Sequence, residues 1–211
     1  MLRFLALPLA FLLAPLAQAG DCQRIESGVD PGLANNYGDV IFGEAIGQTF
    51  RADGRLIESI TVWRVPYQDV NAFGMHVFVT ATDSLGRPDE TRILASGPEV
   101  FHPNGDGVNP TEFEFVFDPP LALPNLGKYY FAIQSTPCYG TWRLLGVVGI
   151  DHYPEGYTWL NGKTDPELCP YLNPLARRSN PNADLCFRIR YCDFATPTKR
   201  SSWGELKVIY R

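Results

Sequence analysis

Short segments in which apolar and polar residues alternate recur along residues 40–192, and they constrain the fold more than any other feature of the chain. In residues 112–118, Phe113, Phe115 and Phe117 alternate with acidic residues. Alternation with a period of two is typical of a β-strand that buries one face. The other clear runs are residues 56–65, 75–82, 128–135 and 184–192, and weaker runs are residues 45–51, 93–96, 142–148 and 157–160.

The alternation also assigns each strand an inner and an outer face. In residues 112–118 we expect the three phenylalanines to face the core, and Glu112, Glu114 and Asp118 to face solvent. In residues 184–192 we expect an inner row of Leu185, Phe187, Ile189 and Tyr191 and an outer row of Cys186, Arg188, Arg190 and Cys192.

Turn-forming segments separate these runs. Examples are residues 103–107 (Pro-Asn-Gly-Asp-Gly) and 124–127 (Pro-Asn-Leu-Gly), and the chain holds 19 Gly and 18 Pro among 211 residues. Few charges and many turns disfavour helical bundles and coiled coils. The sequence therefore predicts one all-β domain over residues 20–192, an antiparallel β-sandwich or jelly roll of about eight or nine strands.

The first 19 residues have the pattern of a secretory signal peptide. Arg3 precedes an uncharged apolar run over residues 4–16, and Ala17-Gln-Ala19 supplies small residues at a cleavage site. The run contains Pro8 and Pro15 and is shorter than the roughly 20 residues of a membrane-spanning helix, so we expect no transmembrane anchor in the mature chain. This predicts a protein that is secreted or held at the cell surface.

The charge balance disfavours polyanionic partners. The formal net charge is −5, and it becomes −6 once residues 1–19, whose one charged residue is Arg3, are removed. Nucleic acids and anionic lipids reward clustered Lys and Arg. We therefore expect no nucleic acid partner.

Five cysteines in an exported chain indicate disulfides. No Cys-x-x-Cys pair is present and no His stands at ligand spacing from a Cys, which disfavours a zinc site. We expect a Cys22–Cys192 bridge tying the ends of the domain and a Cys169–Cys186 bridge stapling a loop to the last strand. Cys138 is then the odd residue.

A set of landmarks resembles the β-sandwich modules of secreted, surface-sorted bacterial proteins, which occur beside carbohydrate-binding modules. The landmarks are residues 47–50 (Gly-Gln-Thr-Phe), 56–62, 81–88, 123–129, 153–156 with Trp159, and 184–187. The resemblance implies a jelly-roll-like domain with a role at the cell surface. The tail, residues 193–211, looks like a linker followed by an amphipathic segment, similar to C-termini that serve as sorting marks in exported proteins.

The candidate ligand site is an aromatic cluster between residues 138 and 162. Sugars present apolar C–H faces and many hydroxyl groups, which suit exposed Tyr and Trp rings flanked by polar groups. The alternative is that the tryptophans fill the sandwich interior and the tyrosines seal its edge. The predicted ligand-binding residues are Tyr139, Trp142, Asp151, His152, Tyr153, Tyr157 and Trp159.

Metal and catalytic motifs are weaker. Asn104, Asp106 and Asn109 offer oxygen ligands in a tight loop, a candidate for structural calcium, although their spacing differs from a calcium-binding loop and also suits a simple turn. No other cofactor is expected. Glu112 and Glu114 stand about 6.7 Å apart along one strand face, within the range of a glycosidase pair, but solvated charges are the usual interpretation. We expect His76 to be a packed or surface histidine.

These observations predict an exported, non-catalytic β-sandwich module that binds glycan or another cell-surface or extracellular component. One alternative is a structural or adhesive surface protein without a small ligand. Another is a hydrolase on a jelly-roll scaffold, for which the familiar nucleophile and metal motifs are missing from the sequence.

Overall fold

The computed structural model describes residues 22–40, 44–66, 73–102, 106–136, 143–162, 165–174, 176–180 and 182–194. Most of them belong to one compact unit, Gln23–Asp193. The predicted signal peptide and residues 195–211 of the tail lie outside the described residues, so both stay predictions. Within the described ranges no α-helix occurs, and no helical segment is long and apolar enough to cross a membrane.

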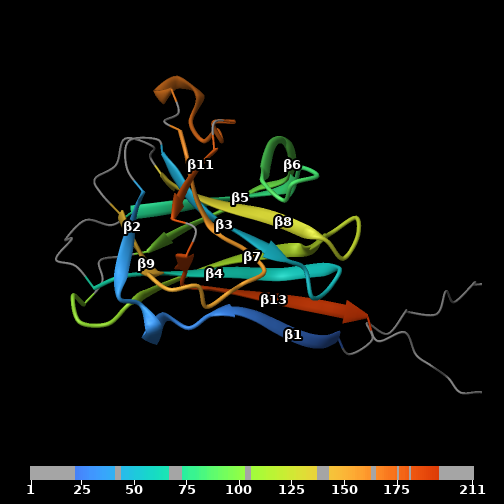
Figure 1. Cartoon of the computed structure of the whole chain (residues 1–211), viewed down its shortest axis with the longest axis horizontal. Helices are drawn as coiled ribbons and strands as arrows, with labels where there is room; N and C mark the ends of the chain where they lie inside the picture. Colours follow the sequence, from blue (N-terminus) through green and yellow to red (C-terminus); the bar gives the residue numbers. More distant parts are fainter. Residues whose placement is uncertain are drawn as a thin grey trace, which may run out of the picture. The chain divides into compact units, whose positions relative to one another are not determined.

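Two antiparallel sheets form the fold, which confirms the predicted all-β class and is compatible with a β-sandwich (Figure 1). The seven-stranded sheet, here called sheet A, has the order β1-β13-β4-β9-β12, with β2 paired to β9 and β7 paired to β4. Its strands are β1 (Cys22–Val29), β2 (Asn36–Val40), β4 (Leu56–Arg64), β7 (Thr111–Ala122), β9 (Arg143–Val148), β12 (Asp184–Leu185) and β13 (Phe187–Phe194).

The six-stranded sheet, here called sheet B, has the order β11-β10-β3-β8-β5-β6. Its strands are β3 (Ala45–Arg51), β5 (Phe73–Thr82), β6 (Pro88–His102), β8 (Lys128–Thr136), β10 (Thr158–Asn161) and β11 (Ala176–Asn180). Two short 3-10 helices, η1 (Pro31–Leu33) and η2 (Pro166–Leu168), interrupt the loops.

Every predicted run overlaps a strand, and the run at residues 184–192 is divided between β12 and β13, but the predicted number of strands was too low. The sequence missed β1, β2 and β11, and it recognised only residues 93–96 of the 15-residue strand β6. These segments carry weak apolar alternation. The β11 sequence, Ala-Arg-Arg-Ser-Asn, has none, and it is a strand because it pairs with β10.

The predicted inner faces are confirmed in the two clearest runs, but the outer row predicted for residues 184–192 is wrong for Cys186 and Cys192, which are both buried. Phe113 and Phe115 are fully buried and Phe117 is nearly so, whereas Glu112 and Asp118 are exposed and Glu114 is half-buried. The inner row of the last strands lies in the main core between the sheets, its members being Leu185, Phe187, Ile189 and Tyr191. Burying rows of this kind supplies most of the driving force for folding.

The cysteines require a correction. Cys186 is a buried free thiol, so the predicted Cys169–Cys186 bridge is wrong. Cys186 lies against β9: its backbone N–H donates to the Gly146 carbonyl oxygen at 2.8 Å, and a Cβ added at Gly146 would stand 3.4 Å from its Sγ. Cys169 and Cys192 are both held in disulfides. Cys138 and the side chain of Cys22 lie outside the described residues, so the Cys22–Cys192 bridge stays a prediction.

Candidate functional site

Trp159, in the predicted aromatic cluster, is a core residue. Its side chain is 9% exposed and belongs to a second buried cluster that also includes Tyr130 and Leu172. Its indole Nε1 donates to Thr49 Oγ1 at 3.4 Å. The ring is therefore not an open platform for a sugar, and the interior alternative holds for Trp159.

The other described residues of the predicted aromatic cluster either pack against the core or are exposed. Tyr153 meets the ring of Phe187 edge-on at 5.2 Å, and burial raises the pKa of its hydroxyl to about 12. Tyr157 is half-buried against the second cluster, while Asp151 and His152 are exposed. Tyr139 and Trp142 lie outside the described residues. The structure thus brings Tyr153, Tyr157 and Trp159 to the margin of β3 without forming an exposed aromatic surface.

The candidate calcium loop is organised by one side chain. Asp106 Oδ1 accepts from the backbone N–H of Val108 and of Asn109, at 2.8 and 2.7 Å, and Asp106 Oδ2 accepts from Asn109 Nδ2. These hydrogen bonds lower the pKa of Asp106. Asn104 lies outside the described residues, and the described part of the chain holds no group of three His, Cys, Asp or Glu side chains suited to a metal. Calcium binding by this loop stays a prediction, and the hydrogen bonds of Asp106 are those of a turn.

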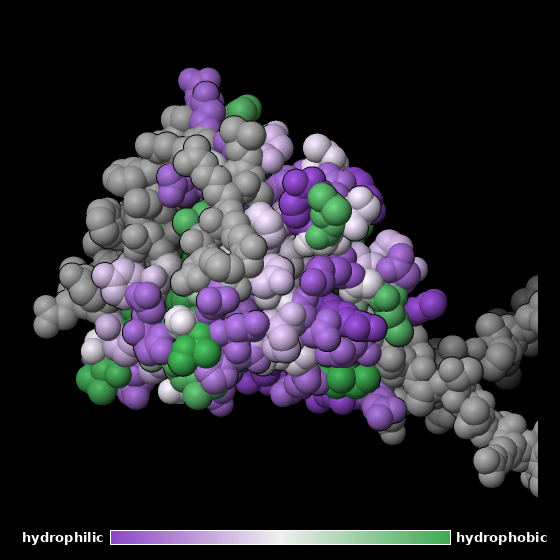
Figure 2. All heavy atoms as spheres, viewed as in Figure 1, coloured by the Kyte–Doolittle hydropathy of each residue, from purple (hydrophilic) through white to green (hydrophobic). Residues whose placement is uncertain are grey.

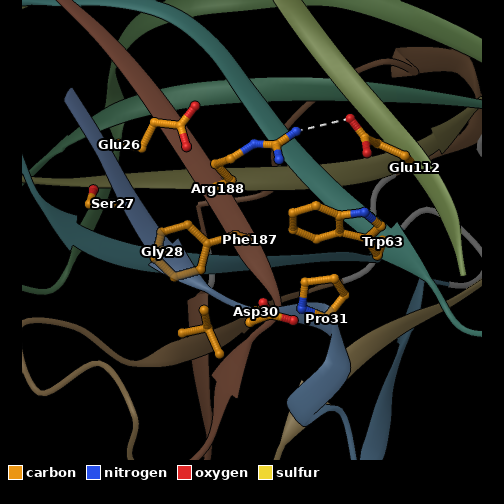
Figure 3. A pocket seen from close by; sticks show the side chains of 10 residues that line it. Glu26, Ser27, Gly28, Asp30, Pro31, Trp63, Glu112, Phe187 and Arg188 are labelled. Atoms are coloured by element: carbon orange, nitrogen blue, oxygen red, sulfur yellow. Dashed lines mark hydrogen bonds and ion pairs between the residues drawn. The ribbon is translucent and has the colours of Figure 1, made fainter. Parts of the chain in front are cut away.

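Charged, polar and apolar side chains suited to ligand binding line an open hollow of about 520 Å³ on the outer face of sheet A (Figure 3). We call it the Trp63–Arg188 hollow. Its lining comes from β1, the start of η1, β4, β7 and β13, and consists of Glu26, Ser27, Gly28, Val29, Asp30, Pro31, Trp63, Glu112, Phe187 and Arg188.

The strand register explains why these side chains meet. Trp63 of β4 pairs with Glu112 of β7, and the neighbouring Thr61 pairs with Arg188 of β13. Side chains two residues apart on a strand share a face, so Trp63 lies beside both charged groups. The Arg188 guanidinium stands 5.3 Å from the centre of the Trp63 ring, and its Nη2 donates to Glu112 Oε1 at 3.0 Å.

A second set of ion pairs borders the hollow. Arg190 donates from Nε to Glu26 Oε1 at 2.8 Å and from Nη1 to Glu114 Oε1 at 2.7 Å. Glu114 also accepts from Ser59 Oγ at 2.9 Å. The hydrogen bond to Glu26 and the neighbouring carboxylates raise the pKa of Arg190. Acidic and basic side chains therefore alternate across β1, β13 and β7, which fixes long side chains that would otherwise be mobile.

Apolar side chains do not dominate the side of the molecule that faces the viewer in Figure 2. The view in Figure 2 shows hydrophobic residues of the described part as separate small patches within a hydrophilic surface.

Sequence reasoning placed Arg188 and Glu112 on an outer face but did not connect them with Trp63. The connection depends on the pairing of three strands that are far apart in the chain, and one sequence does not give that register. The signal that was present is the pair of charged rows on residues 112–114 and 188–190, whose opposite signs match.

Comparison with known proteins does not add to this picture. No protein-family model matches the chain, and no curated protein matches it.

Proposed function

We propose that the Trp63–Arg188 hollow is a non-catalytic binding site for a neutral glycan of an extracellular or cell-surface component. The observation that carries the proposal is a planar guanidinium held over an indole ring, between carboxylates, in an open hollow of about 520 Å³. Ligand sites typically measure about 300–1,000 Å³ and combine apolar surface with a few fixed polar groups.

The chemistry of the lining suits hydroxyl-rich ligands. A sugar hydroxyl both donates and accepts, so it needs acceptors and donors side by side. Glu26, Asp30 and Glu112 supply acceptor oxygens, and Arg188 supplies N–H donors. Pro31 and the edge of Trp63 supply apolar surface for a C–H face.

Two features favour binding over glycoside hydrolysis at this place. Glu112 is engaged by Arg188, and Glu26 by Arg190. A carboxylate in an ion pair acts as a hydrogen-bond acceptor, whereas a glycosidase needs a protonated partner as its general acid. The same reason disfavours Glu112 and Glu114 as a catalytic pair, for which the sequence favoured solvated charges, since Arg190 engages Glu114.

The charges of the hollow point to a neutral ligand. Three carboxylates and one guanidinium line it. Sulfated or uronic acid-rich glycans would meet net repulsion, because like charges brought together out of water destabilise a complex. The signal-peptide pattern and the disulfides at Cys169 and Cys192 support export to a compartment where such a glycan would be met.

A glycan array probed with the purified protein tests the proposal, run with and without a chelator. We expect binding to neutral glycans that is independent of the chelator and is lost or weakened in Arg188→Ala by about 10-fold to 150-fold, the worth of a charged hydrogen bond. Arg92→Ala is the matched control, since Arg92 also pairs with an acidic residue, Asp89, but lies outside the hollow.

Binding that survives in Arg188→Ala would place the site elsewhere. A folded protein that binds no glycan would contradict the proposal and favour the structural or adhesive alternative. Binding that disappears with the chelator would revive the calcium expectation.

A further inference from the structure

A β-bulge interrupts the pairing of β5 with β6 near the middle of both strands. His76 pairs with Glu99 and Phe78 pairs with Ser96, so Gly97 and Pro98 together stand opposite Val77. A bulge inserts one extra residue into one strand, and bulges are common next to active sites.

The extra residue changes which side chains share a face. Ser96 and Glu99 are three positions apart, so in a regular strand they would point to opposite faces. The bulge brings both to the face of His76, away from the main core, where Met75 and Val77 are buried. A serine, a histidine and a glutamate are therefore adjacent on one surface of sheet B.

The contacts among these side chains are specific. His76 Nε2 lies 3.1 Å from Ser96 Oγ, within hydrogen-bond distance. The imidazole packs against the Phe78 ring in a tilted arrangement, with a centroid separation of 4.6 Å and an interplanar angle of 57°, which restricts its orientation. Ser96 and Glu99 are exposed, whereas His76 is 8% exposed. The hydroxyl is thus open to a substrate while its partner is held in place.

We propose that Ser96, His76 and Glu99 form a hydrolytic site for small carboxylic esters, with Ser96 as nucleophile, His76 as general base and Glu99 as the carboxylate that stabilises the imidazolium. A nucleophile and a base within hydrogen-bond reach, with a third group beside the base, are the geometric signature of such sites on unrelated folds. This site lies on sheet B and is independent of the proposed glycan hollow.

The reaction balances with water as the co-reactant. Ser96 Oγ bonds to the ester carbonyl carbon while His76 Nε2 takes the hydroxyl proton. The tetrahedral intermediate then expels the alcohol, which takes that proton from His76, and leaves an acyl-serine. Water attacks the acyl-serine with His76 again accepting a proton, and the carboxylic acid leaves as Ser96 is restored.

Two local features support these roles. Burial lowers the pKa of His76 more than the nearby Glu99 carboxylate raises it, so the imidazole is the free base at neutral pH. The groups facing it across the ladder are Glu99 from β6 and the uncharged Gln134 from β8. Gly97 follows the nucleophile with a φ of 98°, and its position in the bulge leaves it without a partner in the β5–β6 register. Its N–H is the candidate donor to the developing oxyanion.

The experiment combines a fluorophosphonate, which labels activated serines, with p-nitrophenyl acetate hydrolysis by the purified protein. We expect one label on Ser96 by peptide mass spectrometry, and a loss of ester hydrolysis of about a hundredfold or more in Ser96→Ala and His76→Gln. The matched controls are Ser84→Ala, an exposed serine of the turn after β5, and His152→Gln, an exposed histidine. Both should keep wild-type rates.

Glu99→Gln separates the roles further. It keeps the shape but removes the charge that stabilises the imidazolium, so we expect a smaller loss of hydrolysis than in Ser96→Ala and a shift of the acid limb of the pH–rate profile to lower pH. Circular dichroism and thermal unfolding of Ser96→Ala show whether the fold is kept, and an exposed Ser→Ala change should keep it.

An unlabelled Ser96 in the folded wild-type protein would overturn the proposal. So would ester hydrolysis that is equal in wild type, Ser96→Ala and His152→Gln. If His76→Gln fails to fold, labelling in the wild type and rates in Ser96→Ala still decide the matter.

Discussion

Trp63 and Trp159 are almost equally buried, at 8% and 9% exposure, but what covers them differs. Trp63 belongs to the main core cluster, but its ring also lies 5.3 Å from the Arg188 guanidinium and borders an open hollow. Trp159 lies in a buried cluster with Tyr130, Phe78 and Leu172 on sheet B. The Arg188 side chain beside Trp63 can exchange its contacts with a ligand, whereas the side chains packed around Trp159 cannot do so without losing core contacts. Two tryptophans with nearly equal exposed fractions can therefore differ in how readily a ligand could reach them.

The polar groups around the two tryptophans differ in the same way. Near Trp159, Asn161 donates to Glu90 Oε1 at 2.8 Å and to the backbone oxygen of Asn173 at 2.9 Å, and it accepts from the Tyr130 hydroxyl. Glu90 and Asn161 are buried. On sheet A the corresponding groups are ion pairs that remain partly exposed. The first network holds the fold together, and the second is accessible to a ligand.

Replacing Trp159 by Ala tests the structural side of this comparison and should have the largest effect. Removing a buried Trp side chain destabilises by about 3–5 kcal/mol. Urea unfolding followed by circular dichroism measures the loss. A cost below about 1 kcal/mol would mean that the ring is open, and would return Trp159 to the candidate ligand site.

Replacing Glu90 by Gln tests whether the buried network is optimised for a neutral side chain. Burial raises the pKa of Glu90, so its protonated form is favoured by folding. The stability that it contributes is present below the pKa of the unfolded chain and is lost as pH rises through the higher folded value. We therefore expect unfolding free energy to fall less between pH 4 and pH 7 in Glu90→Gln than in wild type.

Chemical denaturation at several pH values measures that slope. The control is Glu167→Gln, an exposed glutamate of η2, which should leave the slope unchanged. A steeper slope in Glu90→Gln would contradict the assignment.

Replacing Arg188 by Ala should have the smallest effect on stability, about 1 kcal/mol or less, because the pair with Glu112 is solvent-accessible. The same change should uncover Trp63 and increase its quenching by acrylamide. The contribution of Trp63 is isolated by repeating the measurement in Arg188→Ala combined with Trp63→Phe. Unchanged quenching would mean that other groups cover this tryptophan.

The parts of the molecule that the sequence predicted are those governed by local alternation. The phenylalanines of residues 112–118 and the inner row ending at Tyr191 lie where a period of two places them. The local pattern could not predict which outer strand faces are covered by other segments of the chain. The sequence allowed Trp159 either a ligand site or the interior, and it placed Cys186 on an outer face; both are buried, by segments distant in the chain.

The two proposed sites show the same limit. Trp63 meets Arg188 and Glu112 through register across three strands, and Ser96 meets His76 through a bulge. A Gly-Pro dipeptide in a strand signals a bulge or an edge. Gly97-Pro98 was therefore a clue in the sequence that the strand containing residues 93–96 continues beyond a bulge.

Strand β6 is the last strand in the order of sheet B and is 15 residues long. A long edge strand can pair with a strand of another chain, which promotes aggregation. Its pairing with β5 shifts register at three places, and Pro98 has no N–H to offer an incoming strand. Ile93 and Phe101 are exposed along it without forming a continuous flat template. The irregularity that positions Ser96 thus also disfavours edge-to-edge assembly of the protein into fibrils.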